Sequence, residues 1–378
     1  MKTERQSPWR WAILGASVMA NMLTTYGTFN AGVLKVAVLR HYGSDDITTT
    51  WLMTYHFSLF ALAAPLASAV INMVNCRACV VLSGILCLAG YTISAFITNF
   101  YLLFFSLTLV GVGRALGMIG SIIILAYYFP DRTNIVTGAS LAGGGLGMFI
   151  HPPLFAFLDE VYGLPGAFLL SGAVAFHGTL CGCVMRPSSG SMRQWVNATV
   201  GPMRQWAIAT VGHCDSGPMR QWANATVGQC DNGSMRQWAN ATVGHCDSGS
   251  LRQWANATMG QCDNGSMRQW VNATVGSVVS RLLGGVLAHD RRVGNLLLYC
   301  GLVGVEALAT LVAPPLLASG QAGTYTYSLL VGLYTGGAVT LINPVIVNVL
   351  GLHKSATGLG VDFFFAGVGG LIGAPVLG

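Results

Sequence analysis

The chain alternates between long apolar runs and short polar breaks, except for one polar stretch in its middle. A helix needs about 20 apolar residues to cross a bilayer, and the runs have roughly that length. Charged and turn residues separate them, as at Asp45-Asp46 and Pro130-Asp131-Arg132. The pattern predicts ten spans, near residues 11–38, 50–74, 78–97, 100–128, 134–158, 163–185, 271–288, 293–317, 325–350 and 355–378.

The polar stretch is a tandem repeat, whose later copies recur every 16 residues. Its copies begin at Ser191, Pro202, Pro218, Ser234, Ser250 and Ser266. We therefore predict three parts: a six-helix transmembrane half over 1–190, the repeat segment over 191–276, and an incomplete transmembrane half over 271–378. The last repeat overlaps the third part. Near-identical polar copies favour a recent duplication that forms a loosely structured loop.

Composition supports a membrane protein. Hydrophobic residues make up 53% of the chain and charged residues only 8%, whereas soluble domains average about 25% charged residues. The net charge of +6 does not indicate nucleic-acid binding, because the basic residues lie mostly between the apolar runs. The first run is too long for the core of a signal peptide. We expect an integral protein of the plasma membrane.

Basic residues orient the bundle, because loops rich in Lys and Arg remain cytoplasmic. Arg77, Arg132 and Arg186 fall in alternate loops of the first half, which places the N-terminus inside. Arg291-Arg292 and Lys354 require the span over 271–288 to run from outside to inside. One crossing between Arg186 and Val271 is then missing. We expect the repeat to stay cytoplasmic with its Asn-x-Thr sequons unused, leaving the second half poorly inserted.

One stretch carries a family resemblance. Tyr128-Phe129-Pro-Asp-Arg132-Thr-Asn-Ile-Val-Thr-Gly138-Ala-Ser-Leu-Ala-Gly143-Gly-Gly-Leu-Gly147 resembles the helix 4–5 signature of the monocarboxylate transporters, within the major facilitator superfamily. Gly351-Leu-His-Lys354 with the glycines that follow is similar to their helix 10–11 region. The resemblance implies an all-α, polytopic transmembrane bundle of two six-helix halves. Here the equivalents of helix 7 and helix 12 are not found.

Arg281 is the first candidate for binding a substrate anion. It lies in the middle of a predicted span, where an ionisable side chain is costly and marks function by default. The resemblance implies that this is helix 8, where proton-coupled members carry an Asp four residues before the Arg. That position is Ser277. We expect that transport is not strongly proton-driven through this pair; the alternative for Arg281 is packing alone.

Two further residues are candidates for the same site. Arg114, midway along the span over 100–128, would offer a second anion contact, or it could pair with backbone carbonyls. Asp362 in the last span could pair with Arg281, or it could lie near the cytoplasmic interface. Glu306 is a weaker candidate. Histidines titrate near neutral pH, so His56, His151 and His177 could carry protons, although buried helix histidines are more often packed.

These features predict a secondary transporter of small organic anions, with monocarboxylates as the expected substrates, that works by alternating access. The alternative is a relative that has lost transport and acts as a membrane scaffold, or the product of a wrongly assigned gene structure. No nucleophile–base or metal constellation predicts an enzyme, a metal site or a cofactor. The expected partners are the small organic anion, a coupling ion whose identity stays open, the lipid bilayer and, as a further candidate, an accessory membrane protein.

Overall fold

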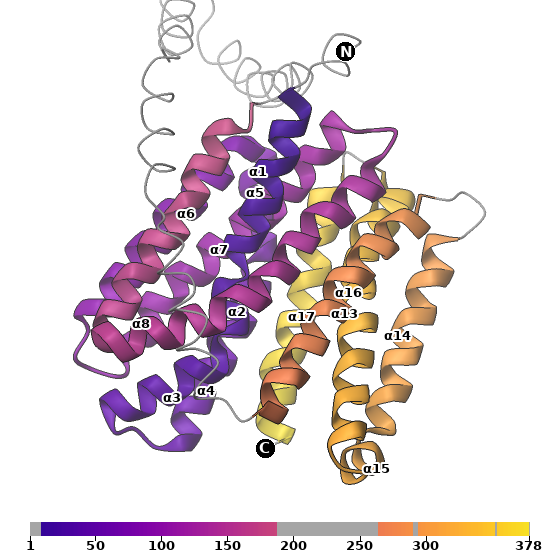
Figure 1. Ribbon diagram of the computed structural model, residues 1–378. Helices are drawn as coiled ribbons and strands as arrows, with labels where there is room; N and C mark the ends of the chain where they lie inside the picture. Colours follow the sequence, from indigo (N-terminus) through magenta and orange to yellow (C-terminus); the bar gives the residue numbers. More distant parts are fainter. Residues whose placement is uncertain (1–8, 187–263, 290–293, 352–353, 378) are drawn as a thin grey trace, which may run out of the picture. The chain divides into compact units, whose positions relative to one another are not determined.

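The computed structural model describes residues 9–186, 264–289, 294–351 and 354–377, and the regular structure in these ranges is helical (Figure 1). By length and composition, six of its helices could cross a membrane. They are Asp46–Met73, Cys76–Phe96, Leu102–Tyr128, Thr133–Val184, Gln321–Leu350 and Ser355–Ile372. The predicted all-α, polytopic transmembrane bundle is therefore confirmed.

The first half follows the six predicted spans, but several of them are broken. Its helices are α1 (Trp9–Thr24), α2 (Tyr26–Phe29), α3 (Ala31–Tyr42), α4 (Asp46–Leu62), α5 (Ala64–Met73), α6 (Cys76–Phe96), α7 (Leu102–Tyr128) and α8 (Thr133–Val184). The first predicted span comprises α1, α2 and α3. The second comprises α4 and α5, and Pro65 lies in the first turn of α5, where a proline is tolerated.

Helix α8 contains two predicted spans, because its 52 residues are divided by a kink. At Gly163 the backbone has φ 67° and ψ 173°, which only glycine adopts readily. This position separates the spans predicted over 134–158 and 163–185. Polar side chains cap the starts of two helices. Asp45 caps α4 by accepting a 3.0 Å hydrogen bond from the Thr48 N–H, and Asn75 caps α6 through the Ala78 N–H.

The second half contains α13 (Asn264–Leu287), α14 (Asn295–Leu311), α15 (Ala313–Ala318), α16 (Gln321–Leu350) and α17 (Ser355–Leu377). Helix α13 begins earlier than predicted and includes the whole last repeat copy, from Ser266 to Gly276. A sequence that was expected to form a loop is helical at this position. The earlier copies lie outside the described residues, so the boundaries of the repeat segment stay a prediction.

Helix α7 is the central element of the first half. Of its most apolar 18-residue window, 89% is buried, against 28–44% in the other five candidate spans. Its side chains belong to two adjoining apolar clusters, one with α1, α5 and α6 and the other with α3, α4 and α8. A polar side chain on the middle of α7, such as Arg114, is therefore surrounded by protein.

The two halves meet along two seams. At one, α8 packs on α13, and the Asn134 side chain donates a 2.6 Å hydrogen bond to the Ala288 carbonyl. At the other, α4 and α5 pack on α17, and the Ser68 hydroxyl donates to the Ala356 carbonyl at 2.6 Å. Asn72 also donates to the Thr357 hydroxyl at 3.2 Å. These contacts join the start of α8 and the end of α5 to the second half.

The contacts also fix the direction of α13 within the bundle. Its last turn lies beside Asn134, close to Arg132, at the end of the bundle where Tyr128 donates to the Arg186 carbonyl at 2.8 Å. Arg186 and the start of α13 consequently lie at opposite ends of the bundle (Figure 1). The second half thus packs in the orientation that the basic residues favour. How the repeat and the second half insert into a membrane stays a prediction.

Candidate functional site

Arg281 lies within α13 and is 7% exposed. Its Nε donates a 3.1 Å hydrogen bond to the Ser277 hydroxyl, one turn earlier on the same helix. One terminal nitrogen, Nη1, donates a 2.9 Å hydrogen bond to the Leu141 carbonyl on α8. The guanidinium thus joins the two halves. The serine in the place of the family's aspartate is the acceptor for Nε.

Small residues on α8 make room for this arginine. A Cβ added at Gly144 would lie 3.3 Å from Nη1 of Arg281, and one added at Gly138 would lie 2.7 Å from its carbonyl oxygen. Helices that carry small residues can approach each other closely in a membrane. The close approach of α8 and α13 therefore brings a guanidinium to a backbone carbonyl, deep in the seam.

Arg114, on α7, is 2% exposed and contacts the end of α1. Its Nε donates a 2.7 Å hydrogen bond to the Thr24 carbonyl. Helix α1 ends at Thr24, and the last carbonyls of a helix need partners from outside its own ladder. The guanidinium carbon also lies 5.0 Å from the centre of the Phe60 ring, within the range of a cation–π interaction.

The structure brings the two arginines to the same part of the bundle. A Cβ added at Gly144 would lie 3.1 Å from a methyl carbon of Thr25 and 3.3 Å from Arg281 Nη1. Thr25 directly follows Thr24, whose carbonyl binds Arg114. Both guanidinium groups therefore lie beside the break that follows α1, one from each half. Two cations near one helix break can attract an anionic group.

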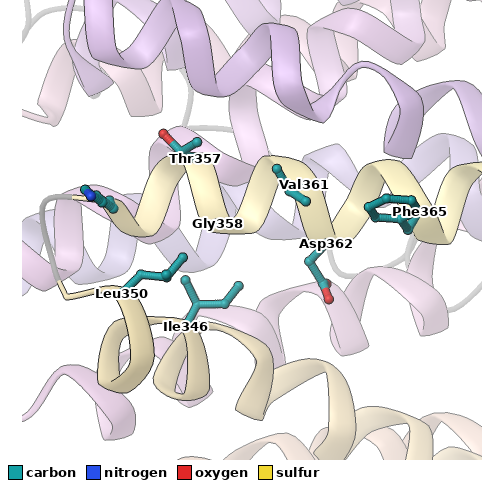
Figure 2. Close-up of a pocket in the computed structure, with 8 residues that line it drawn as sticks. Ile346, Leu350, Thr357, Gly358, Val361, Asp362 and Phe365 are labelled. Atoms are coloured by element: carbon teal, nitrogen blue, oxygen red, sulfur yellow. The ribbon is translucent and has the colours of Figure 1, made fainter.

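Asp362 lies elsewhere, in a groove of about 600 Å³ along α16 and α17 (Figure 2). The groove is lined mainly by apolar side chains, and Lys354 and Thr357 are its other polar residues. In Figure 2 the carboxylate lies on the side of α17 toward Ile346. Within the described residues, no ion pair joins Asp362 to Arg281, so the pairing considered from the sequence is not formed here.

The other acidic and histidine candidates have separate surroundings. Glu306 on α14 accepts a 2.6 Å hydrogen bond from the Thr335 hydroxyl of α16. His177 is exposed, and its Nδ1 lies 3.0 Å from the Ala173 carbonyl of its own helix. His56 and His151 are buried, at 0% and 1% exposure. His56 and His151 thus differ from His177 in being buried. No sequence pattern predicts this difference, since all three histidines lie in apolar helices.

Sequence reasoning also missed a buried polar network in the first half. A 2.6 Å hydrogen bond joins the hydroxyl groups of Ser17 and Ser140. The side-chain amide of Asn21 donates to the Ser121 hydroxyl at 3.1 Å and to the Ser140 hydroxyl at 2.7 Å. This network joins α1, α7 and α8. The spacing of Ser17 and Asn21, one turn apart in an apolar helix, was the available signal. No group of three or more potential metal ligands is found in the described residues.

The sequence also matches a known protein family. The model described as Major Facilitator Superfamily matches residues 17–222, more than half of the chain. The chain belongs to the major facilitator superfamily. Its members are membrane transporters, so the predictions of an integral membrane protein and of a transporter family, not an enzyme family, are confirmed.

Curated relatives of this superfamily member are named as monocarboxylate transporters, which confirms the resemblance. Monocarboxylate transporter 9 of Pongo abelii is 31% identical over 192 residues, which cover 50% of this chain and 38% of that protein. Monocarboxylate transporter 12-B of Danio rerio is 31% identical over 180 residues, which cover 47% and 38%. The matched part thus spans little more than a third of the length of these relatives.

A solved structure shows the fold over a longer range. The proton:xylose symporter XylE, bound to 6-bromo-6-deoxy-D-glucose, superimposes with a TM-score of 0.65 at 12% sequence identity. The alignment covers 98% of this chain and 89% of that chain. At this identity the likeness concerns the fold alone.

Proposed function

We propose that this superfamily member is a secondary transporter of small organic anions, with monocarboxylates as the substrate class, and that it works by alternating access in the plasma membrane. Arg281 is the principal anion-binding group, and Arg114 is the second. The names of the relatives support the substrate class. The coupling ion and an accessory membrane protein stay open.

The observation that carries this proposal is the position of Arg281 between the halves. Its Nη1 donates to a carbonyl of α8 across the seam, and Arg114 lies beside the same break in the first half. An arginine offers five N–H donors in a planar fork that suits a carboxylate. An anion that reaches the break would meet cations from both halves, as alternating access around a shared site requires.

Asp362 has a different place in the proposal. Its carboxylate lies in the groove with Lys354 and would repel an anionic substrate. We therefore assign Asp362 no direct substrate contact in this conformation. A role in coupling stays a hypothesis, because it would require α17 to bring the carboxylate nearer to Arg281.

Uptake of a radiolabelled monocarboxylate by cells that express the full chain tests the proposal. We expect Arg281→Ala to lower uptake by about 10- to 100-fold, because hydrogen bonds to charged groups contribute about 1.5–3 kcal/mol. Arg281→Lys keeps the positive charge but loses the planar fork of N–H donors, so its uptake should lie between that of the unaltered chain and that of Arg281→Ala. Arg40→Ala is the matched control, since Arg40 is an exposed arginine whose nearest pair, with Asp159, is 3.7 Å long.

Surface labelling must show equal amounts of each variant at the membrane, so that uptake reports transport. Normal uptake by both Arg281 variants would remove this residue from the site. Absence of uptake by the unaltered chain, with every monocarboxylate tried, would refute the proposed substrate class.

A further inference from the structure

The break between α1 and α2 gathers two nitrogens from different helices. Gly27, in α2, has no side chain, and a Cβ at this position would lie 2.5 Å from Nε2 of His56 and 2.9 Å from Nη1 of Arg114. His56 comes from α4 and Arg114 from α7. Both nitrogens therefore pack against the backbone of Gly27, and they lie close enough together for one carboxylate to accept a hydrogen bond from each.

His56 has unused hydrogen-bonding capacity at this place. It is fully buried, and neither ring nitrogen forms a hydrogen bond of good geometry with a described residue. On α7, the charge of Arg114 and the backbone of Leu107 both interact with the ring. Buried polar atoms in native structures are nearly always paired, and an exception calls for an explanation such as a ligand.

Further unpaired polar atoms lie at and beside the interrupted part of the first span. Asn30, three residues after Gly27, is 2% exposed, and both polar atoms of its side chain lack a hydrogen bond within the described residues. The ring of His151 lies 4.8 Å from that of Tyr26, and its Nδ1 is also unpaired. Hydrogen-bonding capacity is therefore concentrated where the first span is interrupted.

We propose that His56 and Arg114 form a proton-dependent carboxylate site, in which the anion binds between them and His56 takes up a proton from water as it binds. The proposal rests on the proposed transport of organic anions and adds the means of coupling. The proton attaches to the free ring nitrogen, and no other bond is made or broken.

Electrostatics explains why the two events are linked. In the empty site the Arg114 cation faces His56, and a second positive charge beside it is unfavourable. A carboxylate placed between them attracts both charges, so it favours the proton on the ring. By linkage, the proton must then favour the carboxylate to the same degree. Cys87 and Tyr91 of α6 and His151 of α8 are titratable groups that also interact with Arg114, and Tyr26 of α2 contacts Tyr91 and His151.

An aromatic pair connects this site to the seam between the halves. Phe60, whose ring lies 5.0 Å from the Arg114 guanidinium carbon, packs edge-on against Phe363 of α17 at 5.8 Å. Separation of α4 and α17 would take Phe363 away from Phe60. The movement that opens the seam would thus change the surroundings of Phe60, which contacts Arg114.

Binding of propionate to the purified full chain, measured by calorimetry between pH 5.5 and 7.5, tests this inference. One linked proton makes the affinity rise by up to about tenfold for each unit that the pH falls. We expect His56→Gln to remove this dependence and Arg114→Lys to weaken binding at every pH. His177→Gln is the matched control, because His177 is an exposed histidine of α8, and it should keep the full dependence.

A second variant guards against misfolding of His56→Gln. Gly27→Ala leaves both side chains intact but puts a methyl group between them, and we expect it to weaken propionate binding at low pH. Affinity that does not change with pH, or an unchanged dependence in His56→Gln, would overturn the inference. If binding still required Arg281 in that case, the proposed function would stand alone. No binding of propionate or of larger monocarboxylates at any pH would overturn both.

Discussion

A single added methyl group at Gly138 should open the seam between α8 and α13. In the structure a Cβ at this position lies 2.7 Å from the Arg281 carbonyl oxygen and 2.9 Å from the Cα of Gly285. Ordinary contact begins near 3.4 Å, so the backbones must separate by about 0.7 Å at this point. Neither neighbour is the flexible end of a side chain, so the helices themselves have to move.

The magnitude follows from the cost of overpacking, which is typically about 1–3 kcal/mol. Since each 1.4 kcal/mol is a factor of ten, Gly138→Ala should lower the ratio of closed-seam to open-seam molecules by roughly 5- to 150-fold. The added methyl group does not touch the hydrogen bonds of the Arg281 side chain directly. Its main effect should therefore be on the conformational equilibrium.

A cross-link across the seam provides the assay. Asn134 and Ala288 are joined by a 2.6 Å hydrogen bond, so cysteines at these two positions should react with a short bifunctional reagent when the seam is closed. The native cysteines are replaced by serine for this purpose. We expect Gly138→Ala to lower the rate of cross-linking. Gly301→Ala is the control, because nothing lies within 4 Å of a Cβ at Gly301. An equal rate in both variants would refute the reasoning.

Two other predictions concern individual side chains. Ser277→Asp puts a carboxylate where Arg281 Nε now donates to a hydroxyl at 3.1 Å. It should add a proton-dependent component to monocarboxylate uptake, and this component should persist when His56→Gln is also present. Uptake under an imposed pH gradient measures this component, and an unchanged response would contradict the prediction. Asp45→Ala removes the cap on α4 and should lower the thermal unfolding midpoint, whereas Asp45→Asn, an equally good cap, should not. A thermal unfolding midpoint of Asp45→Ala equal to that of Asp45→Asn would contradict the second prediction.

The sequence predicts where the chain forms helices better than where those helices break. Each predicted apolar span is mostly helical over its described residues, because length and apolar composition mark a membrane-crossing helix. The breaks at Thr25 and Asn30 were not predicted, since no charge or proline marks them. The start of α13 was also missed. Its first residues belong to the polar repeat, whose composition suggested a loop.

For the candidate site, the sequence identifies the residues but not their partners. Arg281 and Arg114 are noticeable because a cation in the middle of an apolar helix is costly. Their acceptors are the carbonyls of Leu141 and Thr24, and any residue type supplies a carbonyl. The carbonyl that is available depends on how the helices pack and on where a helix ends, and neither can be inferred from a single sequence. The grouping of His56 with Arg114 depends on the same packing.

The hydrogen bond between Arg281 and Leu141 gives the proposed mechanism a physical basis. It crosses the seam between the halves, and the seam must open if the protein works by alternating access. Opening it without substrate would leave a buried cation short of one acceptor, which costs several times more than an ordinary hydrogen bond contributes. A carboxylate that accepts from the same nitrogen would replace the lost carbonyl. Anion binding and opening of the seam would thus favour each other, because one guanidinium serves both.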